Sequence, residues 1–174
     1  MKYLSALLLI VTLGLSACKK DVVNPGYEDS YSAWLSFKKS SGNSYSYITY
    51  YGSWTGSYAE SKITVQSGRV IARDFLLTRT TAVRDSVVTL ARWAESGSTL
   101  NTHTDGFEML TLDQVYARAK NEWLKVDKVK NEVIFQANNN GLISLAGYVP
   151  KGCQDDCLTG IHIKDIEVYV KEIK

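Results

Sequence analysis

Two segments of the chain carry apolar side chains at the spacing of an amphipathic helix. Between Glu28 and Ser40 the apolar positions follow an i, i+3, i+4, i+7 pattern, which predicts a helix. Residues 111–123 repeat this periodicity and open with Thr111 and Gln114 at the spacing of a capping box. We therefore predict one helix at the start of the folded region and a second in its middle.

Seven further segments are rich in β-forming residues, several with alternating apolar and polar positions, and each predicts a strand. They are residues 44–54, 57–68, 69–78, 84–94, 132–137, 142–149 and 161–173. Ser67 and Gly68 are suited to a tight turn between the second and third strands. In the last segment the alternation changes phase, which predicts a β-bulge near Lys164 and Asp165.

The order of these elements is helix, four strands, helix, three strands. Antiparallel meanders with helices packed on one face of the sheet make an α+β domain. We predict that fold for residues 28–174, as two helix-plus-meander halves, α-β4 and α-β3. A degenerate internal repeat is one interpretation of the two halves.

The N-terminal segment has the pattern of a secretory signal. Lys2 precedes an apolar run from Leu4 to Leu15, about a dozen residues, which is too short for a bilayer core that needs roughly 20. The next letters, Leu-Ser-Ala-Cys at 15–18, resemble the lipobox of bacterial lipoproteins. That resemblance implies a signal peptide at residues 1–17 and a lipidated Cys18. A plain signal peptide cut after Ala17, which would leave a free cysteine, is the alternative.

A polar stretch follows the predicted lipidation site. Two or more acyl chains hold a protein stably on a membrane, so residues 18–27 are interpreted as the lipidated cysteine and a tether. Lys19 and Lys20 resemble the residues that follow the lipidated cysteine in outer-membrane lipoproteins of Gram-negative bacteria. We therefore expect a location in the cell envelope, at the outer membrane, with the face of that membrane left open.

The balance of charges and the lack of known catalytic motifs exclude several classes of function. The chain has 20 Lys and Arg against 18 Asp and Glu with no basic stripe, so no nucleic-acid partner is expected. Nucleophile elbow, phosphate-binding loop, zinc-protease and calcium-loop motifs do not occur in the sequence. We expect no catalytic residue, no metal site and no cofactor.

Cys153 and Cys157 are the cysteines left once Cys18 is lipidated. Disulfides persist in an oxidising envelope compartment, and closing so short a loop stabilises by roughly 2 kcal/mol. A redox site favours C-x-x-C spacing, and a zinc site would need two more ligands, for which the chain has only His103 and His162. A structural disulfide is the favoured interpretation, with redox and metal roles as alternatives.

Tyrosine is plentiful, and five of the 11 tyrosines lie in residues 45–58. Tyrosine gives a large contact area at low entropic cost and is common on binding surfaces, and aromatic faces also stack on sugars. The candidate ligand-binding residues are Tyr45, Tyr47, Tyr51, Trp54 and Tyr58. Packing in the core or on an ordinary surface is the alternative for the same residues.

Several stretches together resemble a bacterial family. The segments AWLSFKKSSGNSYSYITYY, ITVQSGRV, LTLDQVYARA, CQDDC and IHIKDIEVYV are similar to the domain-of-unknown-function family numbered six-one-seven-four, found in secreted lipoproteins. The resemblance covers roughly residues 28–173. It implies an envelope location and an α+β fold, and it brings no activity.

The expected function is therefore that of a membrane-anchored, non-enzymatic module that binds a protein or a glycan in the envelope. The alternative is an inhibitor-like module that acts on an envelope hydrolase, by analogy with the tandem layout of β-lactamase-inhibitor proteins. A hydrolase built from loop residues, with His103 as its base, is a third hypothesis.

Overall fold

The computed structural model describes residues 25–82 and 86–171, so the predicted signal peptide and Cys18 lie outside the described residues. The predicted order of helices and strands is confirmed. The helices are α1 (Pro25–Ser40) and α2 (Leu112–Arg118). The strands are β1 (Tyr45–Gly52), β2 (Ser57–Gln66), β3 (Arg69–Thr80), β4 (Val87–Ser96), β5 (Asn131–Gln136), β6 (Leu145–Pro150) and β7 (Thr159–Val168).

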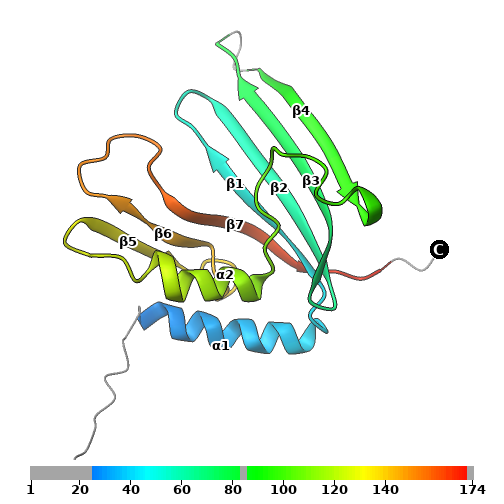
Figure 1. Cartoon of the computed structure of the whole chain (residues 1–174), viewed down its shortest axis with the longest axis horizontal. Helices are drawn as coiled ribbons and strands as arrows, with labels where there is room; N and C mark the ends of the chain where they lie inside the picture. The colour runs from blue at the N-terminus through cyan, green and yellow to red at the C-terminus, as the bar shows by residue number, and fades with distance from the viewer. Residues whose placement is uncertain (1–24, 83–85, 172–174) are drawn as a thin grey trace, which may run out of the picture.

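All seven strands belong to one antiparallel sheet in the order β4-β3-β2-β1-β7-β6-β5 (Figure 1). Within each half the strands follow one another as a meander. The last strand, β7, pairs with the first, β1, and this pairing joins the two halves into one continuous sheet. The predicted antiparallel α+β class is confirmed.

Two local predictions about the strands are also confirmed. Ser67 and Gly68 connect β2 to β3 with φ values of 49° and 78°, as a two-residue hairpin turn of the primed type requires. The predicted bulge lies in β7, where Ser46 pairs with Glu167 and Ile48 with Lys164, so that two steps along β1 match three along β7.

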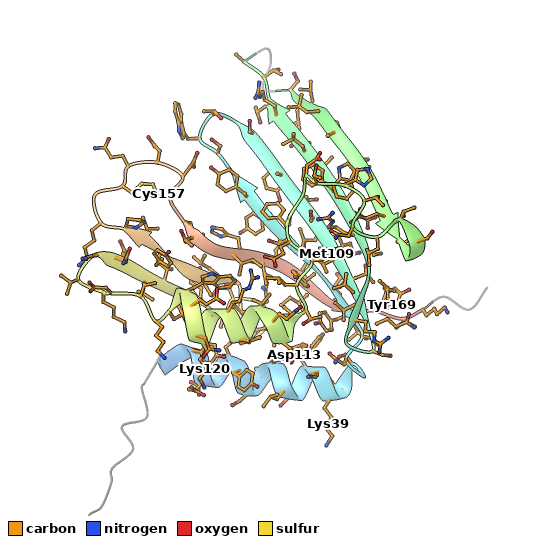
Figure 2. All side chains as sticks on the ribbon, viewed as in Figure 1. Lys39, Met109, Asp113, Lys120, Cys157 and Tyr169 are labelled. Carbon is orange, nitrogen blue, oxygen red and sulfur yellow. A yellow bond between two sulfur atoms is a disulfide. The ribbon has the colours of Figure 1, made fainter. Side chains whose placement is uncertain are left out.

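The two helices pack against each other through aromatic side chains. Trp34 of α1 stacks on Tyr116 of α2 with ring centroids 6.1 Å apart, and it also meets the ring of Tyr45 from β1 at 5.3 Å. Asp113 links the helices as well, because it accepts hydrogen bonds from Trp34 Nε1 at 3.0 Å and from Lys38 Nζ at 2.7 Å (Figure 2). The interhelical contact is thus both apolar and charge-assisted.

The capping box at the start of α2 is present, since Thr111 accepts a hydrogen bond from the Gln114 amide and Gln114 accepts one from the Thr111 amide. The second half of the predicted helix differs from expectation. Residues Ala119–Trp123 form a π-helical turn, and the chain leaves the helix after it. A π-helical turn changes the direction of the side chains that follow it, and here it helps to bury Trp123 and Leu124.

The helices lie toward one end of the sheet, near β5, β6 and β7, while β3 and β4 extend beyond them (Figure 1). There the 100–110 segment contacts the sheet instead, through the Phe107 amide on Ser61 and through Arg73, which donates to the carbonyls of His103 and Phe107. The prediction that the helices cover one face of the sheet is therefore only partly met.

The folded domain begins earlier than predicted. α1 starts at Pro25, and Tyr27 is buried with its hydroxyl donating to the Tyr116 carbonyl at 3.0 Å. Residues 25–27, assigned to the tether, are therefore part of the helix. The reason is that Tyr27 stacks on Tyr31 one turn later, with ring centroids 5.9 Å apart, and this contact extends the apolar stripe toward the N-terminus.

Candidate functional site on the uncovered face of the sheet

Of the five aromatic residues proposed as a binding surface, two are buried in the core and three lie nearer the surface. Tyr45 and Tyr47 are fully buried in the core. The Tyr45 hydroxyl accepts a hydrogen bond from the Leu112 amide at 2.7 Å, and the Tyr47 hydroxyl donates to the Leu110 carbonyl at 2.6 Å. The assignment of a ligand-binding role to these two tyrosines is wrong. A buried tyrosine needs a partner for its hydroxyl. These two find theirs in the backbone at the start of α2, and the two hydrogen bonds hold that end of the helix on the sheet.

The other three candidate residues stay near the surface. Tyr51, near the end of β1, is 37% exposed, and Trp54, in the β1–β2 turn, is 77% exposed. Tyr58 is half-buried in β2 and pairs with Gly52, which places its side chain on the opposite face from that of Tyr51. The three residues therefore lie around one end of the β1–β2 hairpin and do not share a single face.

One face of the sheet carries a band of half-buried and exposed side chains. Residues in register lie side by side on the same face. One row reads Lys164, Ile48, Lys62, Asp74 and Ala94, and the next reads Tyr50, Glu60, Leu76 and Arg92. The aromatic core residues that contact the helices project from the other face, so we call this band the uncovered face.

At its centre, Lys164 lies among aromatic and acidic groups. Its Nζ donates to the Tyr58 hydroxyl at 2.9 Å and lies 3.0 Å from Glu60 Oε2, and Tyr58 donates to the same carboxylate at 2.7 Å. The ammonium is 5.5 Å from the ring centroids of both Tyr50 and Tyr58. His162 lies against Tyr50 with ring centroids 5.3 Å apart. We call these five residues the Lys164 cluster.

The charges of this cluster follow from its contacts. The hydrogen bond to Tyr58 raises the pKa of Lys164, so its ammonium stays charged at neutral pH. Burial acts to raise the pKa of Glu60, but the hydrogen bonds from Tyr58 and Lys164 lower it overall. Burial raises the pKa of Tyr58 and lowers that of His162, which favours the neutral form of both. The cluster thus presents one ion pair framed by neutral rings.

Two shallow hollows flank the cluster. One, of about 450 Å³, lies over β2, β3 and β4 and is lined by Glu60, Lys62, Asp74, Leu76 and Arg92 among others. The second, of about 430 Å³, lies between the end of β1 and the loop that carries the two cysteines, and His162 and Tyr50 form part of its wall. A ligand bound over the cluster could therefore place side chains in the hollow on either side of it.

Cys153 and Cys157 form a disulfide in the β6–β7 loop, at the end of the sheet remote from α1 (Figure 2). The loop is attached to the β1–β2 turn by Asp156, which accepts a hydrogen bond from Ser53 Oγ at 3.0 Å. A hydrogen bond with Asp156 also raises the pKa of Tyr51. The disulfide loop and the hairpin turn thus make one wall of the second hollow.

His103, the proposed base of a hydrolase, belongs to a different arrangement. Its Nδ1 is 3.2 Å from Glu95 Oε2, and its ring stacks on Trp93 with a centroid distance of 4.1 Å. Glu95 is fully buried and paired with Arg73 at 2.8 Å. Burial would raise the pKa of Glu95, but backbone hydrogen bonds, His103 and the Arg73 charge lower it to about 2. Because Glu95 also accepts the Thr102 and His103 amides, the arrangement fastens the 100–110 segment to the sheet.

Sequence reasoning missed four members of the Lys164 cluster. The alternation of β2 did place Tyr58 and Glu60 on one side. The pairing of β7 with β1, which brings Lys164 and His162 to them, has no local signal in the sequence, because the two strands are more than 100 residues apart.

Within residues 25–82 and 86–171, no group of three or more His, Cys, Asp and Glu side chains is placed to hold a metal ion. None of the helices in that part of the chain has the length and apolar character needed to cross a membrane. In comparisons with protein-family models, curated proteins and solved structures, the chain matches none of them.

Proposed function

We propose that this protein is a non-enzymatic, membrane-anchored lipoprotein of the cell envelope that binds a partner protein through the uncovered face of its sheet. The observation that carries the proposal is the band of Tyr50, Tyr58 and Leu76 among charged residues of both signs on a face that the helices leave free. Aromatic residues mixed with arginine are typical of the energetically dominant parts of protein interfaces.

The size of the face favours a protein over a small ligand. The whole side of the sheet to which this band belongs is roughly 30 Å wide, since seven strands lie about 4.8 Å apart, and strands that rise about 3.3 Å per residue run roughly 20–40 Å. The product is on the order of 800 Å², which is what one partner contributes to an interface of standard size. The two hollows are shallow and open, whereas small-molecule sites enclose most of their ligand.

The charges indicate the chemistry of the partner. Lys62 and Arg92 are exposed at the surface of the first hollow, and Asp74, which pairs with Lys62, lies on the strand between theirs. A partner surface with acidic groups opposite the two cations and a basic group opposite Asp74 would be electrostatically complementary. Such complementarity mainly sets specificity and the association rate.

Lipid attachment at Cys18 is the second part of the proposal and rests on the lipobox-like residues 15–18. Anchoring would concentrate the domain at the membrane and restrict its partners to that surface. Metabolic labelling with a palmitate analogue tests it. Cys18→Ser is expected to lose the label and to leave the membrane fraction, whereas a Cys18→Ser protein that stays in the membrane would contradict lipid anchoring at this residue.

The binding surface is tested by site-specific photocrosslinking of the full chain in its native membranes. A photoreactive phenylalanine analogue at Leu76, within the uncovered face, is expected to give one discrete protein adduct. The same analogue at Leu35, which is exposed on α1, is the matched control and is expected to give none. Arg92→Glu should reduce the Leu76 adduct at least fivefold, whereas Lys128→Glu in the exposed loop after α2 should leave it unchanged.

Equal labelling at the two positions, or no protein adduct at either, would overturn the proposed surface. If no protein adduct forms and the protein is retained on a glycan array, the partner is a saccharide and not a protein. If the Leu76 adduct contains a hydrolase, and that hydrolase loses activity on binding, the protein would be identified as its inhibitor.

A further inference from the structure

A third pocket, of about 230 Å³, lies on the side of the sheet that carries the helices, and it shares Tyr50, Tyr51, Leu158 and His162 with the second hollow. It is lined by residues of β1, β7, the 107–110 segment, α2 and the π-helical turn. Its apolar wall consists of Phe107, Leu110, Trp123, Leu158 and Ile161. The volume corresponds to about eight water molecules in the liquid, so the pocket suits a small organic molecule.

The apolar wall is held in place by features already described. The hydrogen bond from the Tyr47 hydroxyl to the Leu110 carbonyl fixes one side. The π-helical turn orients Trp123, which is 8% exposed, on another side, and such turns are frequent at functional sites. Ile161 belongs to β7. The wall is therefore formed before a ligand arrives, which reduces the ordering cost of binding.

One ion pair lines the same pocket. Arg118 Nη1 donates to Glu108 Oε2 at 2.6 Å and Arg118 Nη2 donates to Oε1 at 2.8 Å. The two side chains are 36% and 60% exposed. Both side chains are partly exposed, so solvent screens the pair, and another carboxylate can take the place of Glu108 on Arg118.

We propose that this pocket binds a free α-amino acid with an apolar side chain. The ligand carboxylate would take the bidentate position that Glu108 now occupies on Arg118, and the ligand ammonium would pair with the released Glu108. The apolar side chain would lie against Leu110, Trp123 and Ile161. A carboxylic acid alone would leave Glu108 beside a second negative charge, and an amine alone would leave Arg118 unpaired, so a zwitterion is the best complement to this rim.

The proposal is tested by calorimetric titration of the folded chain with leucine, 4-methylpentanoate and 3-methylbutylamine. These probes share a branched apolar group, and the second and third each lack one charge. Leucine is expected to bind at least tenfold more tightly than either analogue. Glu108→Gln and Arg118→Gln should each weaken leucine binding at least tenfold, and both residues are exposed enough for the variants to fold.

Glu132→Gln, an exposed acid on β5 away from the pocket, is the matched control and should bind leucine within twofold of the unaltered protein. Absence of leucine binding, equal binding of the three probes, or equal losses in all three variants would each overturn the assignment. Because Arg92 is not among the residues that line this pocket, Arg92→Glu should leave leucine binding unchanged whatever its effect on a protein partner.

Discussion

Replacement of Arg73 by methionine tests the buried ion pair that holds the 100–110 segment to the sheet. The side chains of Arg73 and Glu95 are 5% and 0% exposed. Arg73 donates from Nε to Glu95 at 2.9 Å, from Nη1 to the Phe107 carbonyl at 2.9 Å and from Nη2 to the His103 carbonyl at 3.0 Å. The guanidinium also lies over the Trp93 ring, 4.9 Å from its centroid. Methionine keeps an unbranched apolar stem, shorter than that of arginine, and removes all of these polar contacts.

The expected loss in the free energy of unfolding is about 3–5 kcal/mol, which is the usual cost of leaving one member of a buried ion pair without its partner. The loss comes mainly from Glu95, whose carboxylate keeps the Thr102 and His103 amides but loses its charged partner. The carbonyls of Phe107 and His103 lose their donor as well. Arg73→Lys keeps the charge but cannot reproduce the forked geometry, so it should lose part of this stability.

Urea denaturation at pH 7, followed by tryptophan fluorescence and circular dichroism, measures the effect. Arg92→Met is the matched control. Arg92 lies one residue from Trp93 in β4, but it is exposed on the uncovered face, and a change there should stay within about 0.5 kcal/mol. A loss below about 1 kcal/mol for Arg73→Met, with an unchanged dependence on urea, would refute the reasoning that this pair fastens the segment.

Three further predictions follow from buried polar groups. The pKa of Glu95 is about 2 in the folded protein, below its ordinary value near 4.3. Its stabilising effect is therefore complete above about pH 4.5 and is lost as the pH falls toward 2, and Glu95→Gln should flatten the pH dependence of urea stability in that range. An identical slope in the variant would contradict this. Tyr47→Phe removes the donor to the Leu110 carbonyl, so we expect a loss of about 1–2 kcal/mol in chemical denaturation, and an unchanged midpoint would count against that role. The Thr49 hydroxyl is buried without a hydrogen-bond partner among the described residues, so Thr49→Val should leave stability unchanged or raise it by up to about 1 kcal/mol in thermal unfolding, and a clear loss would show that the hydroxyl has a partner.

Several features of the fold could be predicted because their causes are local. The capping box of Thr111 and Gln114 needs only residues three apart, and it marks the start of α2. The turn at Ser67 and Gly68 is set by the two residues that adopt positive φ. The bulge in β7 appears in the sequence as a change of phase, because alternation reports which side of a strand each residue occupies.

The candidate site was less predictable because it depends on contacts between residues that are far apart in the sequence. Tyr45, Tyr47 and Tyr51 share one side of β1, and alternation alone shows this. It does not show that this side is the buried one, since a tyrosine suits a core with a hydroxyl partner as well as a surface. The carbonyl of Leu110 and the amide of Leu112, which supply those partners, come from a segment more than 60 residues away.

The sequence by itself determined the identity and order of the helices and strands, the turn between β2 and β3 and the position of the bulge, because propensity and periodicity act over a few residues. Only the tertiary structure decided that β7 pairs with β1, and that pairing places Lys164 between Tyr50 and Tyr58. Only the tertiary structure likewise forms the Arg73–Glu95 pair on neighbouring strands and the pocket beside Trp123. These sites depend on which surfaces meet after burial of the apolar side chains, and that outcome is set by the packing of the whole domain.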